Sequence, residues 1–497
     1  MSINSFIKSM MNIMRDDAGI DGTVQTLSQI VWMLFLRVYD KKEEDWELFE
    51  EDYESPLEDK YKWRNWVAGE KQNTQLTGHE LLDFVNNDLF PKLKGIVVTD
   101  ITPRRVSILK EMMSEANNYM KDGVCLRKAV NLINGIDFDN YDESHAFNDI
   151  YEGLLKYLQA AGKQGEYYTP RALTTWITKM VNPKLGETVA DFACGTGGFA
   201  VSAIEHIREN IEVPSIKDEE ILEDTILCVE KKQLPYMLCT TNLLLHGIAD
   251  PKVMHGNSLE KNVREYRDKD KVDIILMNPP YGGNEQSSIL SNFPADLRNS
   301  ETADLFMIEI LYRLKENGRV GIVLPDGFLF GVDNSKRAIK EKLFKECNVH
   351  TIIRLCGSVF APYTSIATNL IFFDKTGATE ETWFYRFDLP EGYKAFSKTR
   401  PLTLEHMQVI TEWWNNREDI KDEKEDEAMT ETWKAKKYSI QEIIDRNYDI
   451  DLCGFPIKED IILSPEETIT NFKEKRESLD AMMDKKLAEI LTLLGGE

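Results

Sequence analysis

The sequence predicts an α/β fold with a doubly wound, mostly parallel sheet, a helical N-terminal domain and a helical C-terminal tail. Residues 1–149 show helical periodicity with few strand signals, and residues 167–373 alternate short β-branched runs with helical stretches. The chain ends in a long amphipathic stretch. Because 497 residues exceed one average domain, we expect a helical domain at 1–150, a core at 151–400 and an acidic C-terminal region at 401–497.

The N-terminal segments 23–40 (TVQTLSQIVWMLFLRVYD) and 106–120 (VSILKEMMSEANNYM) carry apolar residues at helical spacing. The most apolar run, IVWMLFL at 30–36, is too short to span a bilayer and follows no signal-peptide pattern. We therefore expect a soluble protein that is not exported.

Charge and cysteine content restrict the function classes. The formal net charge is -25, from 85 acidic and 60 basic residues, which argues against a protein that coats nucleic acid non-specifically. If the chain binds DNA, we expect a partner to supply much of the positive electrostatic potential.

The seven cysteines form no CxxC pair, and the seven histidines do not join them at zinc-ligand spacing. This predicts a reduced, metal-free cytoplasmic protein.

Six β-branched runs separated by helical stretches predict the strands of the core. They are ETVADF (187–192), DTILCVE (224–230), KVDIILM (271–277), GRVGIVLP (318–325), VHTIIRLC (349–356) and SIATNLIFF (365–373). Open α/β sheets bind ligands at the carboxyl ends of their strands, so residues that follow these runs are the candidate site.

A glycine loop follows the first strand. The segment DFACGTGGF, from Asp191 to Phe199, predicts a strand, a turn and the start of a helix, and its glycines let a ligand approach backbone N–H groups. It is not the dinucleotide fingerprint GxGxxG. A tight turn without a ligand explains the loop equally simply. The loop residues we assign to cofactor binding are Asp191, Gly195, Thr196, Gly197 and Gly198.

Two further strand tips carry polar residues. Glu230 ends the second strand, where a carboxylate can accept hydrogen bonds from both ribose hydroxyls. Asn257 follows the third, where its amide could bind an adenine ring, although a turn-forming Asn is an equal alternative. Together with the glycine loop, they predict a nucleoside-bearing cofactor.

The segment GEYYTPR, residues 165–171, lies just before a predicted helix. Thr169 and Pro170 there are either an N-cap with a first-turn proline or ligand contacts. We include this segment in the predicted cofactor site as Glu166, Tyr167, Tyr168, Thr169, Pro170 and Arg171.

The motif NPPY, Asn278 to Tyr281, directly follows the VDIIL strand. An amino group conjugated with a ring or carbonyl is a poor nucleophile, and acceptors for both its protons orient it for methyl transfer. We predict that the Asn278 side-chain oxygen and the Pro279 carbonyl are these acceptors. Pro279 and Pro280 lack N–H groups and have restricted φ, so they hold the carbonyl rigid. Tyr281 can stack on the acceptor. The alternative, a rigid turn with a buried tyrosine, is disfavoured because the motif follows a VDIIL strand downstream of the glycine loop.

The C-terminal stretch 464–494 begins with a candidate N-cap, Ser464, and Pro465 in the first turn. Its apolar residues form one stripe at three-and-four spacing, which predicts a helix that docks on a partner or packs on its own domain. The stripe comprises Ile469, Phe472, Leu479, Met483, Leu487, Ile490 and Leu494. Upstream, the charge block 417–427 (REDIKDEKEDE) is typical of a solvated loop or an exposed helix face.

Several motifs together resemble one family. The chain combines EYYTPR, DFACGTGGF, Glu230, NPPYGG, LPDGFLFG and NYDIDLCGF. In this combination it is similar to the modification subunit of type I restriction-modification systems. The resemblance implies the Rossmann-like methyltransferase fold, S-adenosylmethionine as cofactor and adenine N6 in double-stranded DNA as target. It also implies an adenine-specific DNA methyltransferase that works with a specificity subunit, two modification subunits to one, and with a restriction subunit for cleavage.

Two other functions remain open from the motifs alone. NPPY also suits a carboxamide, as in a protein glutamine N5-methyltransferase, and the fold could serve as a non-catalytic scaffold. The large helical domain disfavours the first, and the intact Asn278 and glycine loop disfavour the second. The resemblance places the protein in the cytoplasm of a bacterium or archaeon, without a membrane partner.

Overall fold

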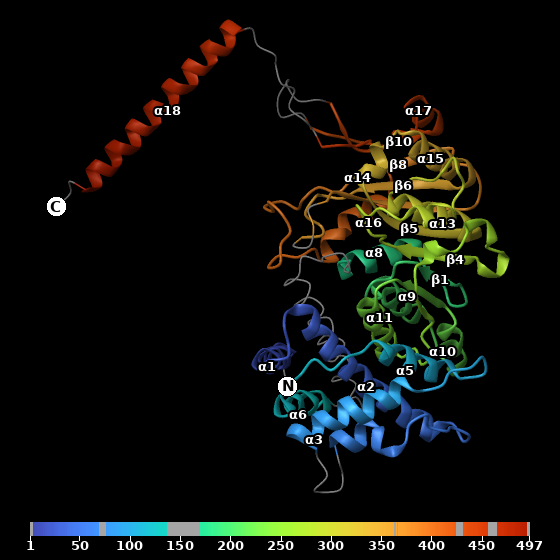
Figure 1. The fold of residues 1–497 in the computed structure, drawn as a ribbon. Coiled ribbons are helices and arrows are strands. Elements are labelled where there is room, and N and C mark those ends of the chain that lie inside the picture. Colours follow the sequence, from blue (N-terminus) through green and yellow to red (C-terminus); the bar gives the residue numbers. More distant parts are fainter. Residues whose placement is uncertain are drawn as a thin grey trace.

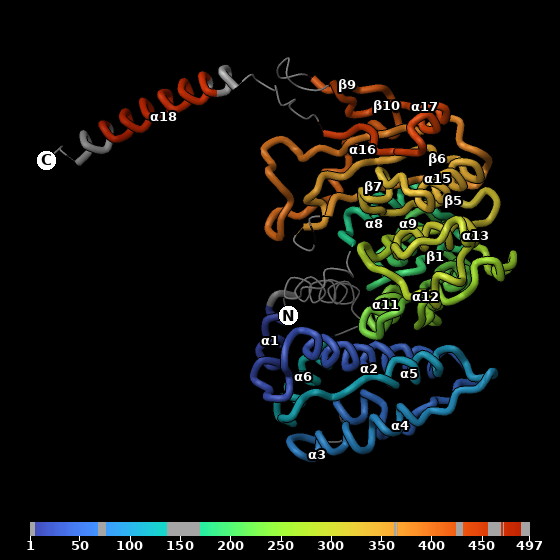
Figure 2. The backbone as a smooth tube through the Cα atoms, turned by 45° about the horizontal axis from the view of Figure 1, so that its top comes forward, coloured from blue at the N-terminus to red at the C-terminus, as the bar shows by residue number. Residues whose placement is uncertain are grey.

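The protein consists of a helical lobe, an α/β lobe and one separate C-terminal helix (Figures 1 and 2). The computed structural model describes residues 3–68, 76–136, 169–361, 364, 366–423, 431–455 and 465–494. The expected boundary near residue 150 and the residues Glu166, Tyr167 and Tyr168 lie outside this set. None of the described helices is long and apolar enough to cross a membrane.

The N-terminal lobe is helical, as predicted, and its described residues contain no strand. Its core forms around α2, where Trp32 and Phe35 are completely buried. Asp122 caps the helix that begins at Gly123, because its side chain accepts hydrogen bonds from the N–H groups of Val124 and Cys125. The α-helices are α1 (Ile3–Asp16), α2 (Thr23–Phe49), α3 (Gly78–Asp83), α4 (Phe90–Lys94), α5 (Arg104–Ser114) and α6 (Gly123–Asn134).

The α/β lobe contains one mixed sheet with the strand order β3-β2-β1-β4-β5-β7-β6-β8-β10-β9. Strands β1 to β5 are parallel neighbours, whereas β7 runs antiparallel to both β5 and β6. The strands are β1 (Val189–Asp191), β2 (Ile226–Glu230), β3 (Val253–His255), β4 (Val272–Met277), β5 (Leu314–Pro325), β6 (Asn348–Arg354), β7 (Thr368–Asp374), β8 (Glu381–Arg386), β9 (Ile420–Lys421) and β10 (Trp433–Ser439).

Helices cover both faces of the sheet, which is the doubly wound arrangement. Side chains of β4 alternate between the faces: Ile274 belongs to one apolar core and Ile275 to the other. The first core also contains residues of α8 (Arg171–Val181), α9 (Gly198–Glu209) and α11 (Gln233–Leu245), and the second contains residues of α13 (Thr302–Arg313) and α15 (Asn334–Glu346). The remaining helices are α10 (Ile216–Glu223), α12 (Ser287–Leu290), α14 (Asp326–Phe330), α16 (Gln408–Asn415), α17 (Ile440–Asp445) and α18 (Pro465–Leu494).

The sheet continues past residue 400, where we expected the core to end, because β10 pairs with β8. The described part of the acidic block contains the edge strand β9. Asp422 there accepts a 2.6 Å hydrogen bond from the buried guanidinium of Arg386. An ion pair with a buried cation explains why this part of the block packs on the sheet. Residues 424–430 lie outside the description.

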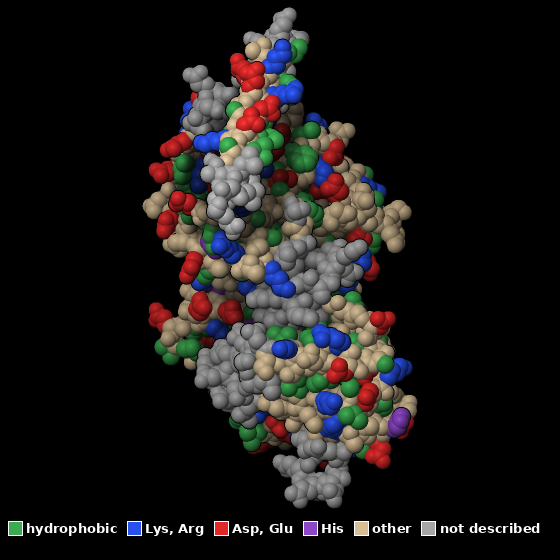
Figure 3. Space-filling view, turned by 90° about the vertical axis from the view of Figure 1, so that its left-hand side faces the viewer, with side chains coloured by type: hydrophobic (Ala, Val, Ile, Leu, Met, Phe, Trp, Pro, Cys, Tyr) green, Lys and Arg blue, Asp and Glu red, His purple; other side chains and the backbone are tan. Residues whose placement is uncertain are grey.

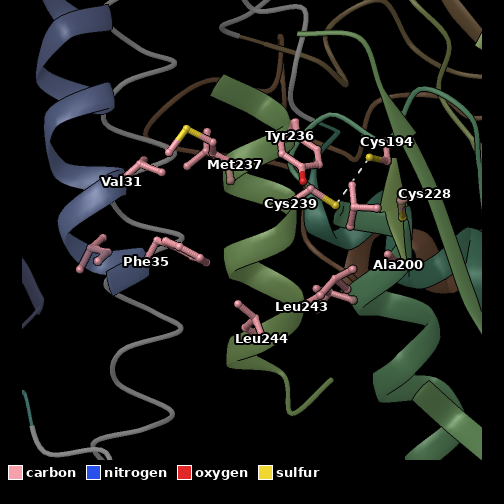
Figure 4. Packing of buried hydrophobic residues seen from close by; sticks show 14 of the residues in the cluster. Val31, Phe35, Cys194, Ala200, Cys228, Tyr236, Met237, Cys239, Leu243 and Leu244 are labelled. Atoms are coloured by element: carbon pink, nitrogen blue, oxygen red, sulfur yellow. Dashed lines mark hydrogen bonds between the residues drawn. The ribbon is translucent and has the colours of Figure 1, made fainter. Parts of the chain in front are cut away.

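The two lobes are joined through α11. Val31 and Phe35 of α2 point towards this helix (Figure 4). Beside this apolar contact, the Tyr236 hydroxyl donates to Glu111 Oε2 at 2.7 Å, and Arg104 Nη2 donates to the Val253 carbonyl at 2.8 Å. The helical lobe is therefore packed against the elements that follow the tip of β2.

A buried histidine in β6 should make the fold sensitive to acid. His350 packs between Phe372 and Trp414, and burial, together with the nearby Arg417, lowers its pKa to about 4. Between pH 6.5 and 4 the unfolded chain binds a proton that the folded chain does not, so stability falls as pH falls. We expect His350→Phe to remove about 1–3 kcal/mol of this loss.

Urea unfolding at pH 7 and pH 5 measures this effect. The wild type should lose more stability on acidification than His350→Phe, whereas exposed His79→Phe should behave like the wild type. Equal acid sensitivity of His350→Phe and wild type would exclude His350 as the cause.

Candidate active site

A cavity of about 100 Å³ lies at the carboxyl edge of the sheet, next to the tips of β1, β2, β3 and β4. Five of the predicted site residues line it, and the rest of the wall comes from loops and α13. The lining residues are Phe192, Ala193, Gly195, Glu230, Lys231, Lys232, Gly256, Asn257, Ser258, Asn278, Pro280, Glu285, Thr302 and Phe306.

The glycine loop begins directly after β1. The Asp191 side chain is buried and accepts a 3.1 Å hydrogen bond from the Ala193 N–H group, which turns the chain at the strand end. Burial raises the pKa of Asp191 well above its usual value. Gly195 and Gly197 then adopt positive φ angles of 55° and 81°, which glycine adopts without a side-chain penalty.

Side chains from neighbouring helices hold the rest of the loop. Arg171 Nη1 donates to the Gly198 carbonyl at 2.9 Å, and Asn242 Nδ2 donates to the carbonyl of buried Thr196 at 3.0 Å. Arg171 follows Pro170, which is the N-cap residue of α8. Arg171 of the predicted segment therefore supports the glycine loop. Thr169, Pro170 and Arg171 do not line the cavity.

Gly197 has little room for a side chain. A Cβ atom there would lie 2.9 Å from the Cys239 sulfur, at a φ angle that disfavours other residues. We expect Gly197→Ala to destabilise the fold by about 1–3 kcal/mol and to weaken cofactor binding. Denaturant unfolding and calorimetric titration with S-adenosylmethionine measure the two effects.

Gly357→Ala is the matched control for this substitution, since a Cβ atom at Gly357 would meet nothing within 4 Å. It should leave both quantities unchanged. A Gly197→Ala protein with wild-type stability and cofactor affinity would contradict the tight packing of the loop.

Glu230 connects the glycine loop to the tip of β2. Its carboxylate accepts hydrogen bonds from the N–H groups of Gly195, at 3.0 Å, and Lys232, at 2.7 Å. The side chain is only 7% exposed, and burial raises its pKa. A carboxylate has about four acceptor sites, so two remain at this cavity wall. These fit the paired hydroxyls of a ribose.

Asn257 lines the cavity and also forms the turn after β3. Its side-chain oxygen accepts a 3.2 Å hydrogen bond from the Leu259 N–H group, so the turn-forming role is present. Ser258 Oγ donates to the Phe192 carbonyl at 3.0 Å and ties this turn to the end of β1. Phe192 and Phe306 add apolar surface to the same cavity.

The NPPY motif lies at the end of β4. Asn278 Nδ2 donates to Thr169 Oγ1 at 3.0 Å, and Asn278 Oδ1 accepts a hydrogen bond from the Tyr281 hydroxyl. Thr169 thus orients the amide so that its oxygen points to Tyr281. The Tyr281 hydroxyl occupies the acceptor that we predicted for the target amine. Burial strongly raises the pKa of Tyr281, so this hydroxyl remains a donor.

Sequence reasoning missed nine lining residues. Phe192, Ala193, Lys231, Lys232, Gly256 and Ser258 are close neighbours of predicted residues, and extending each motif by two positions would have included them. Glu285, Thr302 and Phe306 follow NPPY at longer distances, and only the fold brings α13 to the cavity. Among the described residues, the predicted ones that do not line the cavity are Thr169, Pro170, Arg171, Asp191, Thr196, Gly197, Gly198, Pro279 and Tyr281. Three of these, Thr196, Gly197 and Gly198, belong to the glycine turn itself.

Three features define an S-adenosylmethionine-dependent methyltransferase. They are the strand order 3-2-1-4-5-7-6 with an antiparallel β7, a glycine loop after β1, and an acidic residue at the tip of β2. An NPPY motif after β4 adds the amino-methylating class. The cavity residues fit the cofactor, since they offer a buried carboxylate to a ribose and apolar walls to a ring.

Comparisons with known proteins agree. Residues 142–459 match the N-6 DNA Methylase family and residues 3–133 match the HsdM N-terminal domain. The chain is 44% identical over 492 residues to the type I restriction enzyme EcoEI methylase subunit of Escherichia coli, covering 99% of this chain and 98% of that one. The chain belongs to the methyltransferase subunits of type I restriction-modification systems.

Solved structures support the same family. A modification subunit of a putative type I restriction enzyme from Vibrio vulnificus YJ016 is 38% identical, with a TM-score of 0.76 over 89% of this chain and 92% of that chain. A chain from a study of complex assembly in a type I restriction-modification system is 31% identical, with a TM-score of 0.79 over 98% of this chain and 97% of that one. The protein is thus an adenine-specific DNA methyltransferase that uses S-adenosylmethionine.

Proposed function

We propose that Asn278 and Tyr281 hold the target adenine while its N6 amine is methylated. The supporting observation is the pair of hydrogen bonds on the Asn278 amide, one to Thr169 and one from Tyr281. Thr169 holds the Asn278 side-chain nitrogen, so the Asn278 side-chain oxygen can accept a proton of the target amine once the Tyr281 hydroxyl moves away. The Pro279 carbonyl is the second proposed acceptor, and Tyr281 becomes free to stack on the base.

The proposed cofactor site uses residues of the cavity and its supports. Glu230 would accept hydrogen bonds from the ribose, while Asn257, Phe192 and Phe306 would surround the adenine of the cofactor. Gly195 and its loop would leave room for the methionine portion. S-Adenosylmethionine supplies the electrophilic methyl group. The predicted contacts of Glu166, Tyr167 and Tyr168 belong to the same proposal.

The family membership supports methylation of DNA over methylation of a protein glutamine or a non-catalytic scaffold. The protein therefore acts in a type I restriction-modification complex. We propose that a specificity subunit selects the target sequence, that two modification subunits bind one specificity subunit, and that restriction subunits add cleavage. The cytoplasm of a bacterium or archaeon is the proposed location.

Helix α18 is the proposed contact with the specificity subunit. It extends away from both lobes (Figures 1 and 2). Its described stripe residues Ile469, Phe472, Leu479, Met483 and Leu487 are between 52% and 67% exposed. An apolar stripe of this length in solvent is unfavourable, so a partner helix that covers it would stabilise the assembly. Side chains of Ile490 and Leu494 lie outside the description.

Substitutions on α18 test this contact. Leu479→Asp with Met483→Asp should abolish co-purification with the specificity subunit, because two charges would be buried without partners. The control Lys473→Asp with Lys486→Asp adds the same number of aspartates at exposed charged positions and should retain the complex. Both variants should bind S-adenosylmethionine as the wild type does. A stable complex with the first variant would show that the contact lies elsewhere.

A further inference from the structure

Three cysteines that are far apart in the sequence meet directly beneath the glycine loop. The Sγ atoms of Cys194, Cys228 and Cys239 all lie within 4.8 Å of one another. The Cys194 and Cys239 sulfurs are 3.5 Å apart, and Figure 4 shows the three thiols facing one another. None is more than 6% exposed. The spacing in the sequence follows no metal-binding motif, so only the fold brings them together.

Each cysteine comes from a different element, and each element is held firmly. Cys194 follows β1, where its N–H group donates to the Val229 carbonyl at 3.1 Å and its carbonyl accepts from the Gly197 N–H group at 2.8 Å. Cys228 lies within β2, and Cys239 within α11. Because strand pairing and a helix fix these positions, the three sulfurs form a preorganised triangle.

We propose that Cys194, Cys228 and Cys239 bind one soft, thiophilic metal ion such as Cu⁺. Thiolate sulfur selects soft ions. With metal–sulfur bonds of about 2.3 Å, a trigonal site requires sulfur–sulfur separations of roughly 4 Å, which lies within the observed upper limit of 4.8 Å. Structural zinc sites have four ligands, and no carboxylate or imidazole of the described residues joins this group. The ligand set therefore favours a three-coordinate ion over zinc.

Protons must leave when the metal binds. Each thiol that becomes a ligand loses its proton to solvent, and three sulfur–metal bonds form.

The metal site is connected to the proposed cofactor site by the loop itself. A trigonal ion would require the Cys194 and Cys239 sulfurs to separate from 3.5 Å to roughly 4 Å, and Cys239 already packs where a Cβ atom of Gly197 would lie. We expect this movement to distort the loop and to weaken S-adenosylmethionine binding. By linkage, the cofactor must weaken metal binding by the same factor. This step rests on the proposed cofactor site, whereas metal binding itself does not.

Metal titration of the full chain tests the site. Under anaerobic, reducing conditions, Cu⁺ in competition with a chromogenic chelator should bind with one equivalent per chain, and Cd²⁺ should give a sulfur-to-cadmium charge-transfer band in the ultraviolet. Cys228→Ala and Cys239→Ala should each lose the equivalent and the band. Cys347→Ala, which removes another buried cysteine outside the cluster, should retain both.

Three results would overturn the proposal. They are the absence of binding to the wild type, unchanged binding in Cys228→Ala and Cys239→Ala, and an equal loss in Cys347→Ala. Tighter binding of Zn²⁺ than of Cu⁺ would overturn the three-coordinate assignment. Circular dichroism of each variant establishes that it is folded.

Calorimetric titration of the Cu⁺-loaded and metal-free chain with S-adenosylmethionine measures the coupling. Weaker cofactor binding to the loaded chain is expected, and unchanged affinity would overturn the link between the two sites. Failure of the metal-free chain to bind the cofactor would instead contradict the cofactor site and leave the metal measurement intact.

Discussion

Asn278→Ala should lower the rate of methyl transfer by about 10²- to 10³-fold, the effect of removing one preorganised polar group that acts on the reacting atoms. The variant lacks the oxygen that we propose accepts a proton from the target amine. It also lacks the amide that Thr169 orients and that the Tyr281 hydroxyl contacts. Transfer of tritiated methyl groups to DNA by the reconstituted complex measures this rate.

Cofactor affinity and complex assembly should change little in this variant, since Glu230 and the glycine loop remain in place. Asn416→Ala, on the exposed end of α16, is the matched control and should retain full activity. Full methyl transfer by a properly assembled Asn278→Ala complex would remove Asn278 from the catalytic site.

The second large effect is expected at Glu230. In the wild type, the two oxygens of the Glu230 carboxylate accept hydrogen bonds from two backbone N–H groups, those of Gly195 and Lys232. In Glu230→Gln, one of these oxygens is replaced by an NH₂ group, which is a donor. One N–H group must therefore face another donor. Lost hydrogen bonds to a charged group cost about 1.5–3 kcal/mol each, so S-adenosylmethionine affinity should fall roughly 10- to 100-fold.

Calorimetric titration of the isolated chain measures this affinity without requiring DNA or partners. Glu209→Gln, at an exposed position on α9, should bind as the wild type does. If Glu230→Gln also bound S-adenosylmethionine with wild-type affinity, binding of the cofactor ribose could not depend on the Glu230 carboxylate.

The sequence allowed the core of the fold to be predicted because its strands are short, buried and bounded by motifs. The run VDIIL predicted β4, whose residues are buried on both faces. Strand direction was less accessible: β7 runs antiparallel to its neighbours although its sequence looks like that of the parallel strands. The extension by β9 and β10 was also missed, because an ion pair between Arg386 and Asp422 offsets the cost of packing acidic residues there.

Some residues of the candidate site could likewise be predicted from the sequence, and others could not. Motif residues such as Gly195, Glu230 and Asn278 could be predicted because each lies at the end of its strand or within four residues after it. Thr302 and the cluster of three cysteines could not, because their positions depend on which helix crosses the sheet edge and on how α11 packs beneath the loop. The prediction of a metal-free protein was based on sequence spacing, which cannot reveal that three separate elements bring these cysteines together.

Sequencing of modified bases in a whole genome tests target methylation most directly. DNA from cells that express this chain with its specificity subunit should carry N6-methyladenine at one sequence motif. The mark should disappear when Asn278→Ala replaces the wild type and persist with Asn416→Ala. Methylation of cytosine instead of adenine, or an unchanged adenine pattern with Asn278→Ala, would contradict the proposed role of the NPPY site.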